Sequence, residues 1–418
     1  MKPSEYNLFD YNENSGSTIY NTITGAVISL NENYTRQYVN KCYSDKDFSE
    51  NMKRGGFIIP DDVDEKEYIL SLSSSLRNEN SDDYGFTIAP TMSCNFRCPY
   101  CFEEGHKYNT MTQDVINKTI EYINDKTEKA KSIYISWYGG EPLLRPDIIG
   151  NITKGINREG KQYQAAIVTN GYFLDKEMAI FLKEHNVTHA QVTVDGPPDI
   201  HNRRRCLPDG SDTFFKILKN VLEASGYLRI SIRVNIDKTN LTRTDEILDY
   251  LDQFGMQRKV SLYLAAVDDI NGCCNKECLM EREFSEIEAE FYQKNSERGY
   301  TYTRLPFFNP GICGAVNKSV CVIDPLGDLY KCWNEIGIKS KSYGSIFSKK
   351  TNDNLDKWEN YNPIKSAECD ACKFLPICMG GCPYKSLNSP GIGCMTTKYN
   401  YRKFIDIEIE EDTSGMAK

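Results

Sequence analysis

The spacing of the cysteines constrains this chain more than any other feature of its sequence. The chain has 16 cysteines in 418 residues, and Cys94, Cys98 and Cys101 stand close together. The first residues, MKPSEYNLFD, contain no apolar run of the kind that directs secretion. A cytoplasmic chain keeps its thiols reduced, so we expect these cysteines to bind metal rather than to form disulfides.

Length and charge narrow the classes of partner. A chain of 418 residues suits two or three domains. Its net charge is −9 and it has no basic block, which argues against nucleic acid and anionic membrane surfaces as partners. No apolar stretch reaches the length that spans a membrane. We therefore expect a cytoplasmic protein that binds neither nucleic acid nor membrane.

Strand-like and helix-like segments alternate from residue 86 to about residue 290. One helix-like segment places Ile116, Ile120 and Ile123 on a single apolar face. Six such alternations predict an α/β fold, with a parallel sheet and right-handed crossovers, in the form of a partial (β/α)6 TIM-like barrel. The strand-like runs are Phe86–Ala89, Ser132–Trp137, Gln164–Thr169, Ala190–Val194, Leu228–Ile236 and Val260–Ala265.

The two flanking regions have different patterns. Two short strand-like runs, Gly16–Tyr20 and Gly25–Leu30, open the chain, and the polar stretch 61–83 is an expected boundary. Beyond about residue 300, periodicity gives way to cysteine, glycine and proline, which is typical of a segment that folds around metal. We predict three domains, at residues 1–85, 86–300 and 301–418.

Cys94, Cys98 and Cys101 directly follow the first strand of the predicted barrel. A 4Fe-4S cube that is fully ligated by protein normally takes four cysteines, so three of them leave one iron open. An open metal position can bind a small chelating ligand. A zinc knuckle or a non-catalytic cluster is the alternative on spacing alone.

This CxxxCxxC spacing resembles the signature of radical S-adenosylmethionine (SAM) enzymes. The turn Gly139-Gly140-Glu141-Pro142 after the second strand resembles the GGEP motif of the same family. The resemblance implies that SAM binds the open iron and is cleaved to methionine and a 5′-deoxyadenosyl radical, which removes a hydrogen atom from a substrate.

Further motifs follow the later strands, where β/α barrels collect their functional groups. By resemblance, the turn glycines and Glu141 hold the SAM amino group, Thr193 lies near the ribose, and Arg205 is a candidate for the SAM carboxylate. A surface salt bridge is the alternative for Arg205. Two aromatic residues of the first cysteine loop are expected to pack on the adenine. The expected SAM contacts are Tyr100, Phe102, Gly139, Gly140, Glu141, Asn170, Thr193 and Arg205.

The cysteines after residue 300 resemble the SPASM domain of radical SAM peptide maturases. The resemblance implies two auxiliary 4Fe-4S clusters, in addition to the one that binds SAM. The expected ligands of the outer cluster are Cys369, Cys372, Cys378 and Cys394, and those of the inner cluster are Cys313, Cys332 and Cys382. Cys321 either completes the inner cluster or points away and leaves an iron open. Two structural zinc sites are the alternative for the whole set.

A turn signature, Asp324-Pro325-Leu326-Gly327-Asp328, predicts a hairpin that carries Cys332 back toward Cys313. Elsewhere, Cys273, Cys274 and Cys278 form either another metal loop or a group of ordinary thiols.

The N-terminal strands and helices resemble the winged-helix-like recognition domain of peptide maturases, which captures a leader peptide as an added β-strand. A structural cap on the barrel is the alternative.

The resemblance as a whole favours a maturase of ribosomally made peptides that forms a thioether from a Cys sulfur to a carbon, with flavodoxin or ferredoxin as electron donor. A C–C crosslink is a further option.

Two other functions remain open. Anaerobic sulfatase maturases oxidise a Ser or Cys to formylglycine, but they commonly have an Asp where this chain has Trp333 after Cys332. The third class is non-catalytic, either an iron–sulfur electron carrier or a zinc scaffold.

Overall fold

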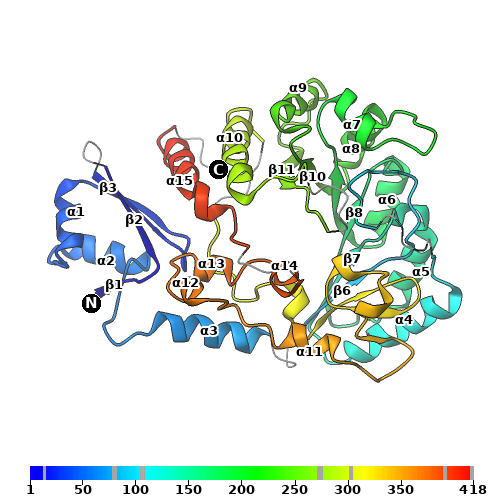
Figure 1. Cartoon of the computed structure of the whole chain (residues 1–418), viewed down its shortest axis with the longest axis horizontal. Coiled ribbons are helices and arrows are strands. Elements are labelled where there is room, and N and C mark those ends of the chain that lie inside the picture. The colour runs from blue at the N-terminus through cyan, green and yellow to red at the C-terminus, as the bar shows by residue number, and fades with distance from the viewer. Residues whose placement is uncertain are drawn as a thin grey trace. The chain divides into compact units, whose positions relative to one another are not determined.

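The computed structural model describes residues 1–12, 16–77, 82–103, 105, 107, 109–270, 276–300, 305–388 and 393–414. These residues divide into two compact units (Figure 1). The first, here called the barrel unit, contains residues 79–302 and 314–360. The second, the terminal unit, contains residues 1–78, 303–313 and 361–418. Within the described part of the chain, no helix is both long and apolar enough to cross a membrane.

Six parallel strands form the centre of the barrel unit, and each overlaps a run predicted from the sequence. They lie side by side in chain order: β6 (Asp83–Ile88), β7 (Ser132–Trp137), β8 (Gln162–Thr169), β9 (Val187–Thr193), β10 (Arg229–Ile236) and β11 (Val260–Ala266). The predicted α/β fold with a central parallel sheet is therefore confirmed.

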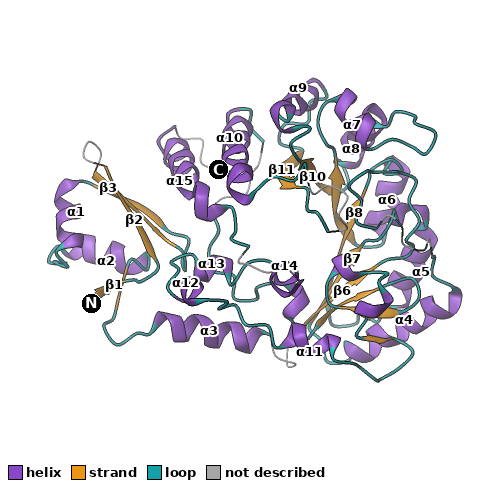
Figure 2. Ribbon diagram, viewed as in Figure 1, coloured by secondary structure: helices purple, strands orange, loops and turns teal. Residues whose placement is uncertain are grey.

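The strands alternate between an apolar and a polar face. Ile230, Ile232 and Val234 of β10 belong to the main apolar core. The opposite face of the same strand carries Ser231, whose Oγ contacts His189 Nε2 on β9 at 2.8 Å. The polar face leaves hydrophilic groups inside the partial barrel, while helices cover the apolar face (Figure 2).

Helices connect successive strands and supply the outer layer of the barrel unit. Thr112 caps the first of them, where its side chain accepts a hydrogen bond from the backbone N–H of Val115. The helices are α4 (Gln113–Lys126), α5 (Pro146–Gly155), α6 (Lys176–Glu184), α7 (Pro198–Arg204), α8 (Phe214–Ala224), α9 (Glu246–Gln253) and α10 (Glu281–Glu297).

The sheet continues past β6 into residues that follow the six-strand core. Strand β12 (Val320–Ile323) pairs with β6 in parallel, and then β13 (Asp328–Tyr330) and β14 (Gly344–Ser345) add in antiparallel fashion. Gly327 has φ +79° in the tight turn between β12 and β13, which confirms the hairpin predicted there. Helix α11 (Asn354–Glu359) completes this part of the unit.

The terminal unit brings the two ends of the chain together. Its N-terminal part has a pair of short strands, a three-stranded antiparallel sheet and three helices. These are β1 (Lys2–Pro3), β2 (Asn7–Asn12), β3 (Gly16–Asn21), β4 (Val27–Leu30), α1 (Glu32–Val39), α2 (Lys46–Arg54), β5 (Ile58–Ile59) and α3 (Glu65–Leu76). Its C-terminal part is mostly loop with α12 (Ala367–Asp370), α13 (Leu375–Cys378), α14 (Pro383–Asn388) and α15 (Thr397–Ser414).

Contacts between these two parts are both polar and apolar. Thr22 Oγ1 donates to the carbonyl oxygen of Lys373 at 2.7 Å, and Lys373 Nζ donates to that of Asn7 at 2.9 Å. Ile69 of α3 and Leu375 of α13 share an apolar cluster.

Helix α3 lies within residues 61–83, the polar stretch that we predicted as a domain boundary. The division at 1–85, 86–300 and 301–418 stays a prediction.

Candidate active site

The three cysteines after β6 lie in one loop, in which the Cys101 N–H donates to the carbonyl oxygen of Cys98 at 3.1 Å. Burial raises the pKa of the Cys94 and Cys101 thiols to about 12. Buried thiols of this kind are neutral until a metal displaces their protons. Three thiols in one loop fit the donor set of an iron–sulfur cluster with one open iron.

The Gly139–Gly140 turn after β7 packs against this cysteine loop. The Gly140 N–H donates to the carbonyl oxygen of Thr91 at 3.1 Å, and the Glu141 N–H donates to that of Ser93 at 2.9 Å. A Cβ atom on Gly140 would lie 2.4 Å from the Ser93 oxygen, and Gly139 has φ +103°. Only glycine fits the close approach of these two backbones.

Glu141 links the ends of two neighbouring strands. Its carboxylate accepts hydrogen bonds from Thr169 Oγ1 at 2.7 Å, from the Asn170 N–H at 2.7 Å and from the Leu143 N–H at 3.0 Å. The side chain is 1% exposed, and this burial raises its pKa. Asn170 Nδ2 donates in turn to Asn95 Oδ1 in the cysteine loop at 2.8 Å. The turn, the end of β8 and the cysteine loop are thus one connected structure.

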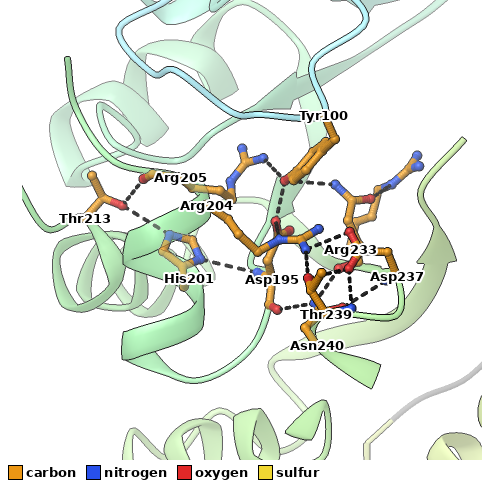
Figure 3. A network of polar contacts seen from close by, with 11 residues as sticks. Tyr100, Asp195, His201, Arg204, Arg205, Thr213, Arg233, Asp237, Thr239 and Asn240 are labelled. Carbon is orange, nitrogen blue, oxygen red and sulfur yellow. Dashed lines mark hydrogen bonds and ion pairs between the residues drawn. The ribbon is translucent and has the colours of Figure 1, made fainter. Parts of the chain in front are cut away.

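Tyr100 connects the cysteine loop with the ends of β9 and β10 (Figure 3). Its hydroxyl donates to Asp195 Oδ2 and accepts from Arg205 Nη1 at 2.8 Å and from Asn235 Nδ2 at 3.3 Å. The guanidinium of Arg204 lies 4.8 Å from the centre of the Tyr100 ring. The expectation that Tyr100 packs on adenine stays a prediction, while its hydroxyl has a polar function that the sequence did not reveal.

Arg205 is buried beside the cysteine loop. It is 7% exposed, so the alternative of a surface salt bridge is wrong. Its guanidinium lies 5.7 Å from the centre of the Phe96 ring, and its positive charge acts to lower the pKa of Cys98 against the larger effect of burial. Its Nε atom is buried and has no hydrogen-bond partner among the described residues. A buried guanidinium with a free donor fits a ligand carboxylate.

His201 fixes the backbone of Arg205. Its Nδ1 accepts from the Asp195 N–H at 3.3 Å, its Nε2 contacts Thr213 Oγ1 at 3.1 Å, and that hydroxyl donates to the Arg205 carbonyl oxygen at 2.6 Å. Burial lowers the pKa of His201 well below its usual value, which keeps the ring neutral. Thr193 ends β9 as a buried residue paired in register with Arg233.

Two polar residues near the loop were missed by sequence reasoning. Glu103 is 8% exposed, burial raises its pKa to about 8, and its Oε1 has no partner in the described part of the chain. Tyr138 stacks on Trp333 with ring centres 5.9 Å apart. Phe102 packs against an apolar cluster that includes Met92 and Tyr330. Of the two missed residues, only Tyr138 had a signal in the sequence, which is its position directly before Gly139 and Gly140.

The four cysteines expected to bind the outer cluster come together in the terminal unit. Cys369, Cys372, Cys378 and Cys394 all line one pocket. Lys398 Nζ lies 3.6 Å from the sulfur of Cys394 in the same pocket. Four cysteines that line one pocket match the number of ligands of a 4Fe-4S cluster.

The expected inner set is divided between the two units. Cys313 and Cys382 belong to the terminal unit, Cys332 follows β13 in the barrel unit, and this cluster stays a prediction. Cys321 on β12 is buried in the main apolar core, where its thiol hydrogen-bonds with Tyr122 of α4 and with Tyr343. Cys273 and Cys274 lie outside the described residues, whereas Cys278 is described.

Comparison with known proteins agrees with this site. Residues 88–251 match the radical SAM superfamily. The mycofactocin maturase of Mycobacterium tuberculosis is 23% identical over 310 residues, which are 70% of this chain and 76% of that protein. The serine-type anaerobic sulfatase-maturating enzyme of Bacteroides thetaiotaomicron is 30% identical over 139 residues, which are 31% of this chain and 33% of that protein.

Two solved structures share the fold. Streptococcus suis SuiB, bound to the precursor peptide SuiA, superimposes with a TM-score of 0.54 at 16% identity and covers 94% of this chain and 98% of its own. The protein anSMEcpe, with bound SAM and a peptide, gives a TM-score of 0.59 at 19% identity, and the match covers 78% of this chain and 97% of that chain.

Proposed function

Because this chain is an enzyme with a radical SAM domain over residues 88–251, we propose that it modifies a ribosomally made precursor peptide. The observation that carries the proposal is the loop of Cys94, Cys98 and Cys101, whose start is hydrogen-bonded to the Gly139–Gly140 turn through the Ser93 carbonyl oxygen. The cluster and SAM, when bound, supply a 5′-deoxyadenosyl radical for hydrogen-atom abstraction. Cys94, Cys98 and Cys101 hold the cluster in this proposal.

The remaining residues of the site bind and orient SAM. The free Nε of Arg205 points to a role as partner of the SAM carboxylate. The turn at Gly139 and Gly140 lets the backbone approach the ligand, and Glu141 holds that turn against the end of β8. These groups are held by hydrogen bonds, so little reorganisation is needed when SAM binds.

A peptide substrate is supported by the relatives and by the N-terminal sheet. The relatives include a mycofactocin maturase, and SuiB has been solved with its precursor peptide SuiA bound. In the three-stranded sheet β2-β3-β4, strand β4 lies at an edge. An edge strand can take up an extended peptide through its backbone groups. We therefore propose that the leader peptide adds to this sheet as a further strand. The electron donor that we propose is flavodoxin or ferredoxin.

The bond that we propose is a thioether. Its formation removes a hydrogen atom from a substrate carbon, a proton from a Cys thiol and one electron. The two auxiliary clusters, with the pocket of Cys369, Cys372, Cys378 and Cys394 as the outer site, are proposed to accept that electron. A C–C crosslink has the same electron balance. Formylglycine formation is the second candidate, because sulfatase-maturating enzymes share the fold.

The proposal is tested by anaerobic reconstitution with iron and sulfide, followed by SAM and dithionite. We expect 5′-deoxyadenosine, measured by liquid chromatography, and none without dithionite. With a Cys-rich peptide encoded next to the gene, a thioether removes a thiol that iodoacetamide alkylates. Formylglycine instead yields an aldehyde that reacts with a hydrazine. Reconstituted protein that forms no 5′-deoxyadenosine would overturn the proposed function.

The outer auxiliary site gives a separate prediction. Cys372→Ala is expected to lower the iron content by about four atoms per chain, because four thiols converge on one 4Fe-4S cluster. Cys42→Ala, which removes an exposed thiol of the same unit, should leave the iron content unchanged. Iron and sulfide analysis of the reconstituted proteins measures both. Equal iron contents in the two variants would show that the pocket holds no cluster.

A further inference from the structure

We propose that Arg204 is a positioning residue: it neutralises Asp195 and thereby leaves Arg205 available for the SAM carboxylate. The inference rests on the proposed function, because it concerns how the same site binds SAM. Arg204 contacts neither SAM nor the cysteine ligands in this scheme, and it acts only through its neighbours.

The two consecutive arginines are both buried but have different partners (Figure 3). Arg204 donates from Nε to Asp195 Oδ2 at 3.0 Å and from Nη1 to Asp237 Oδ2 at 2.7 Å. Arg205 donates from Nη1 to the hydroxyl of Tyr100 at 2.8 Å, and among the described residues it makes no hydrogen bond or ion pair with either carboxylate. Helix α7 ends between them, which turns the two side chains in different directions.

Asp195 is the group for which the two arginines compete. It is completely buried, and a buried carboxylate without a counter-charge is strongly unfavourable. Arg204 supplies that charge. Arg205 is linked to the same carboxylate through the shared hydroxyl of Tyr100, so it is the cation that can move to Asp195 if Arg204 is lost. Arg233, the other cation in the network, is held by Asn235 at 2.8 Å.

Buried polar atoms without hydrogen-bond partners indicate how Arg205 would pair with Asp195 if Arg204 were lost. Among the described residues, Asp195 Oδ1 and Arg205 Nε have no hydrogen-bond partner, and neither has Arg204 Nη2. A guanidinium and a carboxylate form a bidentate pair when each offers a second atom. Asp195 Oδ1 and Arg205 Nε would satisfy one another if Arg205 moved onto Asp195. Arg204 prevents that pairing in the native arrangement because it occupies Oδ2 and balances the charge.

The test compares SAM affinity, measured by equilibrium dialysis of the reconstituted protein without reductant, in matched variants. Arg204→Gln is expected to weaken SAM binding about tenfold or more, the effect of losing one charged hydrogen bond. Arg203→Gln is the control, because Arg203 is exposed on the same helix, and it should bind SAM like the wild type. Arg204→Lys keeps the charge and should retain most of the affinity.

A compensating substitution separates this role from a purely structural one. In Arg204→Gln/Asp195→Asn the competing carboxylate is neutral, and an amide oxygen remains to accept the hydroxyl of Tyr100. We expect SAM affinity to return to within about threefold of the wild type, since the charge that attracts Arg205 is gone. If the double variant binds SAM no better than Arg204→Gln, or if Arg204→Gln binds like Arg203→Gln, the proposal is wrong. Wild-type protein that binds no SAM would instead refute the proposed function.

Discussion

Cys98→Ala is expected to abolish the formation of 5′-deoxyadenosine. Cys98 is the middle one of the three cysteines, between Cys94 and Cys101. With two thiols left, the loop can no longer hold a cube that requires three protein ligands and one open iron. Product should fall below detection by liquid chromatography, and the absorption of the reconstituted protein should keep only the contribution of the auxiliary clusters.

Cys206→Ala is the matched control for this substitution. The carbonyl oxygen of Cys206 accepts a hydrogen bond from the Arg97 N–H at 3.4 Å, so this thiol lies close to the loop without belonging to it. Its replacement should leave 5′-deoxyadenosine formation unchanged. If product formation survives in Cys98→Ala, or is lost in both variants, the assignment of the first cluster to the three loop cysteines is incorrect.

Gly140→Ala is expected to lower the rate of 5′-deoxyadenosine formation by about 100-fold, the usual effect of a displacement near 1 Å at a reacting centre. The new Cβ would lie 2.4 Å from the Ser93 oxygen and 2.5 Å from the Met92 oxygen. Both are backbone atoms, so the cysteine loop itself must move. The shift would change the position of the proposed cluster relative to the turn that we propose to bind SAM.

Gly226→Ala provides the control for an added methyl group. Its Cβ would meet only the Glu223 oxygen, at 3.6 Å, and its φ is not in the left-handed region. We expect its rate to equal that of the wild type. The iron content should be measured in parallel, because Gly140→Ala should retain its clusters and lose mainly rate. A wild-type rate in Gly140→Ala would mean that the turn does not support the cysteine loop.

Local patterns in the chain were enough to predict the central parallel sheet, and they group the cysteines whose assignment as cluster ligands stays a prediction. Strands such as Ser132–Trp137 could be predicted to the residue because buried apolar side chains alternate along them. The loop cysteines and the outer auxiliary cysteines could be grouped because their spacing is short and specific to the chemistry. Gly327 could be placed in a turn because a positive φ strongly favours glycine.

Other features depend on contacts between residues far apart in the chain. The family resemblance singled out Arg205, but nothing in the run Arg203-Arg204-Arg205 predicts burial or ion pairs. In the structure the first is exposed, the second pairs with Asp195 and Asp237, and the third lies beside the cysteine loop. Their separation comes from burial and from partners on other strands. The same holds for the association of the N-terminal sheet with the segment around Lys373.

Short-range periodicity and spacing in this sequence therefore specify its strands and its turn glycines, and they group the cysteines that we propose as metal ligands. Folding decides which carboxylate each arginine meets, which thiol faces the core, as Cys321 does, and which segments join into one unit. The physical reason is that secondary structure and ligand spacing depend on neighbours along the chain. Charge pairing and desolvation depend on every group that the tertiary structure brings near.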